Sequence, residues 1–187
     1  WGGENNFNPD AYLAEGSEHD PQAGEISRKV ISIGGAYCKT LAEAIEAWSS
    51  KETPIVLHDD IVIDKPIEVS KSVFILGDNH CVSVKSDKGQ LFNVRAEGVS
   101  ISMDGVKLSF DGESVPIETP LSALTSIEMQ GCTIEAGSDE GKIVNFAQGG
   151  PVRYEFVNNT VSVLSRGLLV NVYNGSRIVD NEIDLLS

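Results

Sequence analysis

Basic residues are scarce in this chain. Its 187 residues include 28 Asp and Glu but only 14 Lys and Arg, so the formal net charge is −14. Nucleic-acid binding depends on basic groups that neutralise phosphates, and anionic membranes attract the same groups. We therefore expect neither as a partner. An acidic surface of this kind is typical of a soluble secreted or surface protein.

Long apolar runs and a cysteine framework are also missing. No stretch approaches the roughly 18 consecutive apolar residues that a transmembrane helix needs. The three cysteines, Cys38, Cys81 and Cys132, are 43 and 51 residues apart, which matches neither a zinc site nor a set of disulfides. We expect buried structural thiols, with Cys132 pointing inward and Cys81 outward. The chain has no initiator Met and no signal peptide, so we expect it to begin at a processing site or a fragment boundary.

An internal repeat with a period near 26 residues is the strongest feature that is present. Five copies start at steps of 26, 26, 27 and 22 residues: ILGDNHCVSV at Ile75, ISMDGVKLSF at Ile101, IEMQGCTIEA at Ile127, YEFVNNTVSV at Tyr154 and SRIVDNEIDL at Ser176. Such a period indicates stacked units, each of which buries its apolar face against a neighbour.

Two apolar columns of the repeat predict a strand with one buried face. They alternate with a column of Ser, Glu and Asp, as period-two patterning requires. The first column is Val82, Leu108, Ile134, Val161 and Ile183, and the second is Val84, Phe110, Ala136, Val163 and Leu185.

The column just before this strand predicts a bend. It contains only Asn, Gly and Asp, which adopt a positive φ at low cost. Its members are Asn79, Gly105, Gly131, Asn158 and Asp180. The next column, which is His80, Val106, Cys132, Asn159 and Asn181, is expected to hydrogen-bond from one turn to the next.

A second family of strands is predicted from three segments that align without gaps. They are LFNVRAEG (91–98), IVNFAQGG (143–150) and LVNVYNGS (169–176), and they place Asn93, Asn145 and Asn171 in one column. The corresponding segment of the intervening turn, 113–123, contains two prolines, so we expect a loop there.

These patterns predict an all-β fold, a right-handed parallel β-helix of about five to six coils. A β-sandwich also has regular short strands and stays open as the alternative. Residues 26–187 would form this single domain, and the polar residues 1–25 would form an arm or tether. A helix over about 40–49 would cover the first coil, with Thr40 as N-cap and Glu43 reaching back to its amide.

The C-terminal coil has no such cover in the sequence. An uncovered coil exposes apolar side chains and unpaired backbone. We therefore expect either an end-to-end homo-oligomer or a chain that continues beyond Ser187.

The chain resembles the pectin-lyase-like β-helix superfamily over residues 29–187. The segments that carry the resemblance are TLAEAI with PIVLHDDIVIDKPIEVSKSVFILGDN, then LFNVRAEGVSISMDGVKL, IEMQGCTI and YEFVNNTVSV. Similar repeats occur in bacterial surface proteins, several of them lipoproteins of unknown function in Bacteroides-type bacteria. The resemblance implies a secreted or cell-surface location, with a lipid-anchored cysteine expected to precede Trp1 in the native protein.

The enzymes of that superfamily supply a catalytic alternative, a polysaccharide lyase or glycoside hydrolase. Of the polygalacturonase motifs, only an Asp-Asp pair occurs here, at Asp59 and Asp60. Lyases need calcium-binding carboxylates and a basic residue on one outer sheet, but Arg95 is the only basic residue in its column. We therefore expect a protein without catalytic residues.

A binding module for a polysaccharide or surface glycan is the function that we expect. The candidate contacts are Asn93, Asn145 and Asn171 with Arg95 and Tyr173, which would hydrogen-bond sugar hydroxyls. The alternative for the asparagines is that they point inward or cap turns. A further alternative for the whole chain is a structural spacer or adhesin-like stalk.

No cofactor is required by this function, although a calcium ion could bind where carboxylates gather. The candidate ligands are Asp59, Asp60 and Asp64, with Asp111 and Glu113 as a second cluster.

Overall fold

The computed structural model describes residues 17–19, 26–49, 52–111, 114–136, 144–163 and 168–185. Most of the arm expected over residues 1–25 therefore lies outside the described residues. Within it, strand β1 (Ser17–His19) pairs antiparallel with β2 (Ile26–Arg28).

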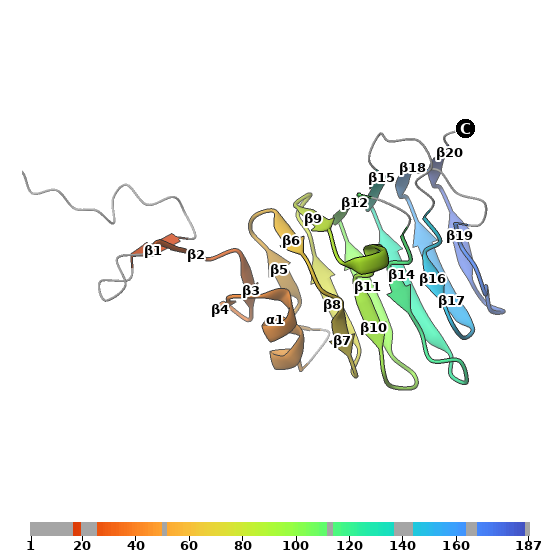
Figure 1. Cartoon of the computed structure of the whole chain (residues 1–187), viewed down its shortest axis with the longest axis horizontal. Coiled ribbons are helices and arrows are strands. Elements are labelled where there is room, and N and C mark those ends of the chain that lie inside the picture. The colour runs from red at the N-terminus through yellow and green to blue at the C-terminus, as the bar shows by residue number, and fades with distance from the viewer. Residues whose placement is uncertain are drawn as a thin grey trace, which may run out of the picture.

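The described chain folds into a parallel β-solenoid of about four turns (Figure 1). Three sheets run along it, and each turn from β5 to β16 places one strand in each sheet. The eight-stranded sheet contains, in spatial order, β19 (Arg177–Val179), β17 (Val152–Val157), β14 (Thr125–Gln130), β11 (Ser100–Asp104), β8 (Val73–Leu76), β5 (Ile55–Leu57), β3 (Ile31–Ile33) and β4 (Ala36–Cys38). The six-stranded sheet contains β20 (Glu182–Leu185), β18 (Thr160–Val163), β15 (Thr133–Ala136), β12 (Lys107–Phe110), β9 (Cys81–Val84) and β6 (Ile61–Ile63). The four-stranded sheet contains β16 (Ala147–Gln148), β13 (Ile117–Glu118), β10 (Phe92–Val94) and β7 (Ile67–Val69), and a short 3₁₀ helix, η2 (Asp87–Gly89), precedes β10.

Parallel pairing decides between the two folds that the repeat allowed. From β5 onward, every pair of neighbouring strands in the three sheets is parallel. A β-sandwich is built from antiparallel sheets, so that alternative is wrong.

The core consists of apolar side chains stacked from turn to turn. In the eight-stranded sheet, Ile101 pairs with Ile127 and Ile127 with Tyr154, and all three side chains are fully buried. The first predicted apolar column is confirmed throughout, because Leu108 pairs with both Val82 and Ile134 and the column continues through β18 and β20. Each turn thus completes the burial of its neighbours, as the repeat predicted.

The predicted bend column is also confirmed. All five of its residues have φ between 53° and 65°. An L residue rarely adopts such a conformation, and Gly, Asn and Asp tolerate it best. The composition of this column therefore determined where the chain turns from the eight-stranded to the six-stranded sheet.

An asparagine ladder follows the bends, as expected for the next column. The Asn159 side chain is 1% exposed, and its Oδ1 accepts from the Cys132 amide at 2.9 Å. Its Nδ2 donates to Asn181 Oδ1 at 2.9 Å and to the Met129 carbonyl at 3.1 Å. These bonds satisfy buried backbone groups that the bend removes from the sheets.

The start of the repeat is offset by two residues in the first copy. Ile101 pairs with Val73, and Ile75 pairs with Met103, so the predicted equivalence of Ile75 and Ile101 is wrong. The reason is the bend at 77–80, which contains two more residues than the bend between β11 and β12.

The loop predicted over 113–123 is also wrong in part. Strand β13 lies within it and pairs with β10 and β16. Pro116 and Pro120 flank this strand rather than interrupt it, and the Pro116 carbonyl accepts from the amides of Leu91 and Phe92. Proline lacks a donor but not an acceptor, so it fits at a strand end.

The predicted cap helix is present as α1 (Leu41–Ala47), with Thr40 as its N-cap and its end two residues earlier than expected. Thr40 Oγ1 accepts from the Glu43 backbone amide at 3.1 Å, as predicted. The Glu43 carboxylate was expected to accept from the Thr40 amide, but it accepts from the Lys39 backbone amide at 2.9 Å. The helix contacts mainly β3, β4 and β7, and β3 covers the edge of β5. In the described residues, no helix has the length and apolar character needed to span a membrane.

Apolar side chains are exposed in the last turn. Val172, Tyr173, Ile178 and Ile183 are 43–49% exposed, and among the described strands β19 and β20 each pair on one side only. An end-to-end contact or further turns would cover this surface, and both stay predictions.

The three thiols are free, and only Cys132 is fully buried. Burial raises the pKa of Cys132 to about 11, although nearby backbone hydrogen bonds oppose the shift. Because the thiolate is the reactive form, we expect Ellman's reagent at pH 8 to label Cys38 and Cys81 in the native protein and Cys132 only after unfolding in urea. Peptide mapping of the labelled chain identifies the sites, and native labelling of Cys132 at the rate of Cys81 would contradict this placement.

Candidate functional site

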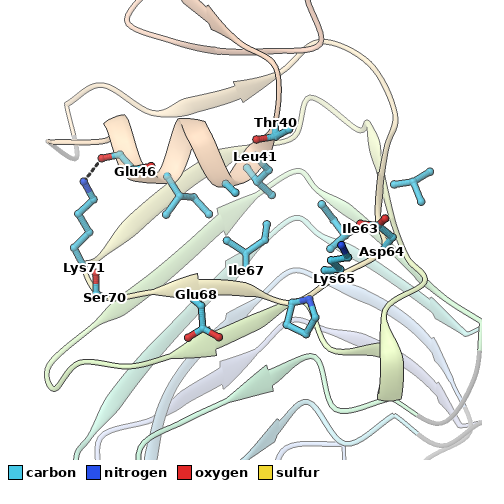
Figure 2. A pocket seen from close by; sticks show the side chains of 14 residues that line it. Thr40, Leu41, Glu46, Ile63, Asp64, Lys65, Ile67, Glu68, Ser70 and Lys71 are labelled. Carbon is cyan, nitrogen blue, oxygen red and sulfur yellow. Dashed lines mark hydrogen bonds between the residues drawn. The ribbon is translucent and has the colours of Figure 1, made fainter.

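A cleft of about 720 Å³ lies between α1 and the strands β6 and β7 (Figure 2). We call it the α1 cleft. Its apolar lining is Leu41, Ala42 and Ile45 from α1, Val62 and Ile63 from β6, and Pro66 and Ile67 at the start of β7. Leu41 and Ile45 are four residues apart and so lie on one face of the helix. The cleft exists because this short helix covers the first turn incompletely.

Charged side chains surround the apolar lining of the α1 cleft. Lys71 Nζ donates to the backbone carbonyl of Glu46, which ties the end of β7 to the helix (Figure 2). The carboxylates that line the cleft are Glu46, Asp64 and Glu68, and the cations are Lys65 and Lys71. Since Glu68 also binds Arg95, acidic and basic groups at the mouth balance.

A row of polar side chains runs along the outer face of the four-stranded sheet and begins at the cleft. The register pairs Glu68 with Asn93, Asn93 with Glu118, and Glu118 with Gln148. We call these four residues, together with the adjacent Gln90 and Arg95, the polar row.

Side-chain hydrogen bonds connect five members of the polar row, all except Gln148, across three turns. Asn93 Nδ2 donates to Glu68 Oε1 at 3.0 Å, and Asn93 Oδ1 accepts from Gln90 Nε2. Gln90 Nε2 also donates to Glu118 Oε2 at 2.7 Å. Arg95 donates from Nε and Nη2 to the two oxygens of Glu68, the second at 3.1 Å. The side chains are thus held in fixed positions before any ligand arrives.

The ion pair between Glu68 and Arg95, at one end of the polar row, moves the pKa of each partner further from 7. The hydrogen bond from Arg95 lowers the pKa of Glu68, and desolvation opposes this only in part. The same hydrogen bond raises the pKa of Arg95. Glu68 is therefore a carboxylate and Arg95 a cation at neutral pH, which suits binding and not proton transfer.

The structure brings together two of the five predicted contact residues, Asn93 and Arg95. The predicted column of Asn93, Asn145 and Asn171 is wrong, because the register continues from Asn93 through Glu118 to Gln148 and not to Asn145. The gapless alignment failed because the connections differ in length: seven residues join β9 to β10, and ten join β15 to β16.

The other predicted contacts lie elsewhere. The Asn145 amide donates to the Ser114 carbonyl at 3.0 Å, beside an isolated bridge between Ser114 and Val144. Asn171 has φ of 55°, and its Nδ2 donates to the Gly149 carbonyl at 3.0 Å, so it caps a turn. Tyr173 is 47% exposed in the last turn.

Sequence reasoning missed Glu68, Gln90, Glu118 and Gln148. A signal was present, since Glu68, Asn93 and Glu118 are separated by two equal steps of 25 residues. This spacing is one residue shorter than the 26-residue repeat, so an alignment of the sequence at 26-residue intervals does not place these three residues in one column.

The three carboxylates predicted to bind calcium do not form one cluster. Asp60 Oδ1 accepts from the Cys81 amide at 2.7 Å, and Asp59 Oδ1 accepts from the Asp60 amide at 2.8 Å. Asp64 lines the α1 cleft instead. Among the described residues, no three His, Cys, Asp or Glu side chains are grouped to hold a metal ion. Glu113 of the second cluster lies outside the described residues, and calcium binding stays a prediction.

A shallower groove of about 260 Å³ lies on the outer face of the eight-stranded sheet. Its lining is Phe74, Ser102, Met103, Asp104, Glu128, Met129, Gln130 and Glu155. The groove has less than half the volume of the α1 cleft, and its Glu128 carboxylate accepts from Ser100 Oγ at 3.0 Å and from Ser102 Oγ at 2.7 Å. The α1 cleft and the polar row are therefore the better candidate site.

Comparison with known protein families, with curated proteins and with solved structures finds no match to this chain.

Proposed function

We propose that this protein is a non-catalytic carbohydrate-binding module whose polar row contacts an extended glycan. The observation that carries the proposal is the row itself: carboxylates and amides at successive turns of one flat sheet. Sugar hydroxyls both donate and accept hydrogen bonds, and the exposed Glu68 and Glu118 offer acceptors while the exposed Gln148 offers both functions. Asn93 is 9% exposed and holds its neighbours in place. Successive strands lie about 4.8 Å apart, so the row presents these groups at regular intervals.

The fixed geometry of the row supports binding. Its side chains are ordered by one another, so less conformational freedom is lost when a ligand binds. In our proposal the Glu68–Arg95 ion pair holds the end of the row in place and presents charged groups to sugar hydroxyls.

The resemblance to pectin-lyase-like proteins supports the handedness, the number of coils and the cellular location that we propose. In our proposal the solenoid is right-handed, with five to six coils in all, and the protein works outside the cell or anchored to its surface. The ligand is then a polysaccharide or a surface glycan.

A matched pair of arginines tests the role of the polar row. Arg95 and Arg177 each form an ion pair with a Glu at nearly equal exposure, with side chains 56% and 57% exposed, respectively. Only Arg95 belongs to the polar row, since Arg177 pairs with Glu155 on the eight-stranded sheet. We expect Arg95→Ala to weaken glycan binding by about tenfold or more, as expected for loss of a hydrogen bond to a charged group, and Arg177→Ala to leave it unchanged.

Native gels cast with individual plant and host polysaccharides, with and without calcium, provide the measurement. Retarded migration without clearing of the stained polysaccharide supports a binding module, and a cleared zone would indicate an enzyme. If a polysaccharide retards the Arg95→Ala and Arg177→Ala variants equally, the binding surface does not include the polar row. Unchanged mobility of the parent protein in every gel would overturn the proposal and favour a structural spacer.

A further inference from the structure

A small hollow opens within the polar row, on the outer face of the four-stranded sheet. It has a volume of about 110 Å³, and its lining residues are Lys88, Gln90, Val115, Glu118 and Gln148. We call it the Lys88 hollow. Gln90, Glu118 and Gln148 also belong to the polar row, so a glycan that lies along the row passes over the hollow.

Three neighbouring turns of the solenoid build the Lys88 hollow. The Val115 amide donates to the Lys88 carbonyl at 3.0 Å, which places these two residues side by side. Gln90 Nε2 donates to Glu118 Oε2 at 2.7 Å, and Glu118 pairs with Gln148 of the next turn. Residues paired in this way in a parallel sheet direct their side chains to the same face. The lining is therefore held in place by the same contacts that order the row.

The size of the Lys88 hollow indicates that it takes a substituent and not a whole sugar. Sites that enclose a small molecule measure about 300–1,000 Å³, which is well above the 110 Å³ of this hollow. One water molecule has a share of about 30 Å³ in the liquid, so the hollow accommodates a group of a few heavy atoms. The sugar ring that carries this group would remain on the row.

The two charges that line the Lys88 hollow favour a neutral but dipolar group. Lys88 contributes a cation and Glu118 a carboxylate, and both side chains are exposed. An anionic substituent would be opposed by Glu118, and a cationic one by Lys88. An amide has no net charge but has a dipole of about 3.5 D, and it donates from its N–H while it accepts at its carbonyl oxygen.

The remaining lining residues match the rest of an acetamido group. Val115 is half-buried and adds an apolar side chain, which a methyl group would cover. Both N–H groups of Gln90 are engaged, one by Asn93 and one by Glu118, so Gln90 offers its carbonyl oxygen. A sugar hydroxyl also donates and accepts, but it brings no apolar part to Val115.

We infer that the glycan contains N-acetylated amino sugars, and that one acetamido group lies in the Lys88 hollow. Its N–H donates to Glu118, its carbonyl oxygen accepts from Lys88, and its methyl group contacts Val115. This inference rests on the proposed carbohydrate-binding function and names the class of sugar that the polar row takes.

The test uses the full chain and three β-1,4-linked tetrasaccharides, built from N-acetylglucosamine, glucosamine or glucose. These ligands differ only at C2 of each sugar, which carries an acetamido, an amino or a hydroxyl group. Isothermal titration calorimetry measures Kd for each. We expect the N-acetylglucosamine tetramer to bind about tenfold or more tightly than either of the others, as expected for hydrogen bonds to charged groups.

A matched pair of lysines locates the acetamido group. Lys88 lines the hollow, whereas Lys85 is exposed nearby in the chain and is not among the lining residues. Lys88→Met should reduce the ratio of the two Kd values, for the N-acetylglucosamine and glucose tetramers, toward one, and Lys85→Met should preserve it. Glu118→Gln should also reduce this ratio, and it provides the second test if Lys88→Met alters the circular dichroism spectrum.

The outcomes separate this inference from the proposed function. Equal binding of the N-acetylglucosamine and glucose tetramers overturns the inference and leaves a sugar-binding row. Tightest binding of the glucosamine tetramer overturns the acetamido group as the preferred substituent. A preference that survives both Lys88→Met and Glu118→Gln overturns the Lys88 hollow as its location. Binding of none of the three tetramers overturns the inference, and retardation by polysaccharides in native gels then decides separately whether the protein binds glycans.

Discussion

Gly149→Ala is expected to destabilise the solenoid by about 4 kcal/mol. The φ of Gly149 is +122°, a conformation that residues with a Cβ rarely adopt, and this strain alone costs about 1–3 kcal/mol. A Cβ at this position would also lie 2.1 Å from the Thr119 carbonyl oxygen and 2.8 Å from its Oγ1. Relief of that clash must move the backbone of a neighbouring turn, which adds about 1–3 kcal/mol. The free energy of unfolding in urea measures the effect.

Gly98→Ala is the matched control for that substitution. Gly98 also has a positive φ, +67°, but an added Cβ would meet no atom within 4 Å. We expect a loss of about 1 kcal/mol, which is the strain without the clash. If both variants lose the same free energy, the close approach of Gly149 to Thr119 is not a feature of the folded protein. This comparison requires that the free energy of unfolding falls with urea concentration at the same slope in the parent protein and in both variants.

Asn159→Ala is expected to cost about 3 kcal/mol, because the ladder that follows the bends is buried. The substitution removes the acceptor of the Cys132 amide and the donor to the Met129 carbonyl. A buried backbone group that loses its partner costs about 1–3 kcal/mol, and two groups are affected. Hydrogen exchange of the Cys132 amide should accelerate in the variant beyond what the lower global stability explains.

Asn174→Ala is the control for the ladder. Asn174 is exposed, and exposed substitutions usually change stability by less than about 0.5 kcal/mol. A loss at Asn159 as small as that at Asn174 would mean that water replaces the side chain at the bend. Unchanged protection of the Cys132 amide would lead to the same conclusion.

The two glycine positions and the ladder also show where turns of the solenoid depend on each other. Gly149 and Thr119 belong to neighbouring turns, and Asn159 connects three. In a repeat protein, stability is roughly a sum of each unit and its interfaces, so these contacts determine how cooperatively the turns unfold. The polar row lies on the same turns, and its geometry depends on their register.

The features that the sequence predicted well all depend on local conformation. The bend at Asn158 follows from a residue type that tolerates positive φ, and the buried column through Leu108 follows from period-two alternation. The helix start at Thr40 follows from a side chain that satisfies an amide three residues later. Each of these signals is contained within about ten residues of chain, and their recurrence about every 26 residues predicted stacked turns without coordinates.

The candidate site depends on which distant residues become neighbours. Connections of unequal length shifted the second family of strands, so Asn93 lies beside Glu68 and Glu118 and not beside Asn145. A shift of this kind changes no local pattern, because both alignments keep apolar residues on the inner face. The α1 cleft likewise arises from how far a seven-residue helix extends over β6 and β7.

The sequence by itself therefore determined where this chain bends, where its strands recur and where its first helix starts, because bends, strands and caps are set by short-range sterics and hydrogen bonds. Only the tertiary structure decided that Glu68, Asn93, Arg95 and Glu118 form one polar row beside an apolar cleft. That arrangement depends on register between turns and on incomplete cover by α1, which are packing outcomes that no short segment encodes.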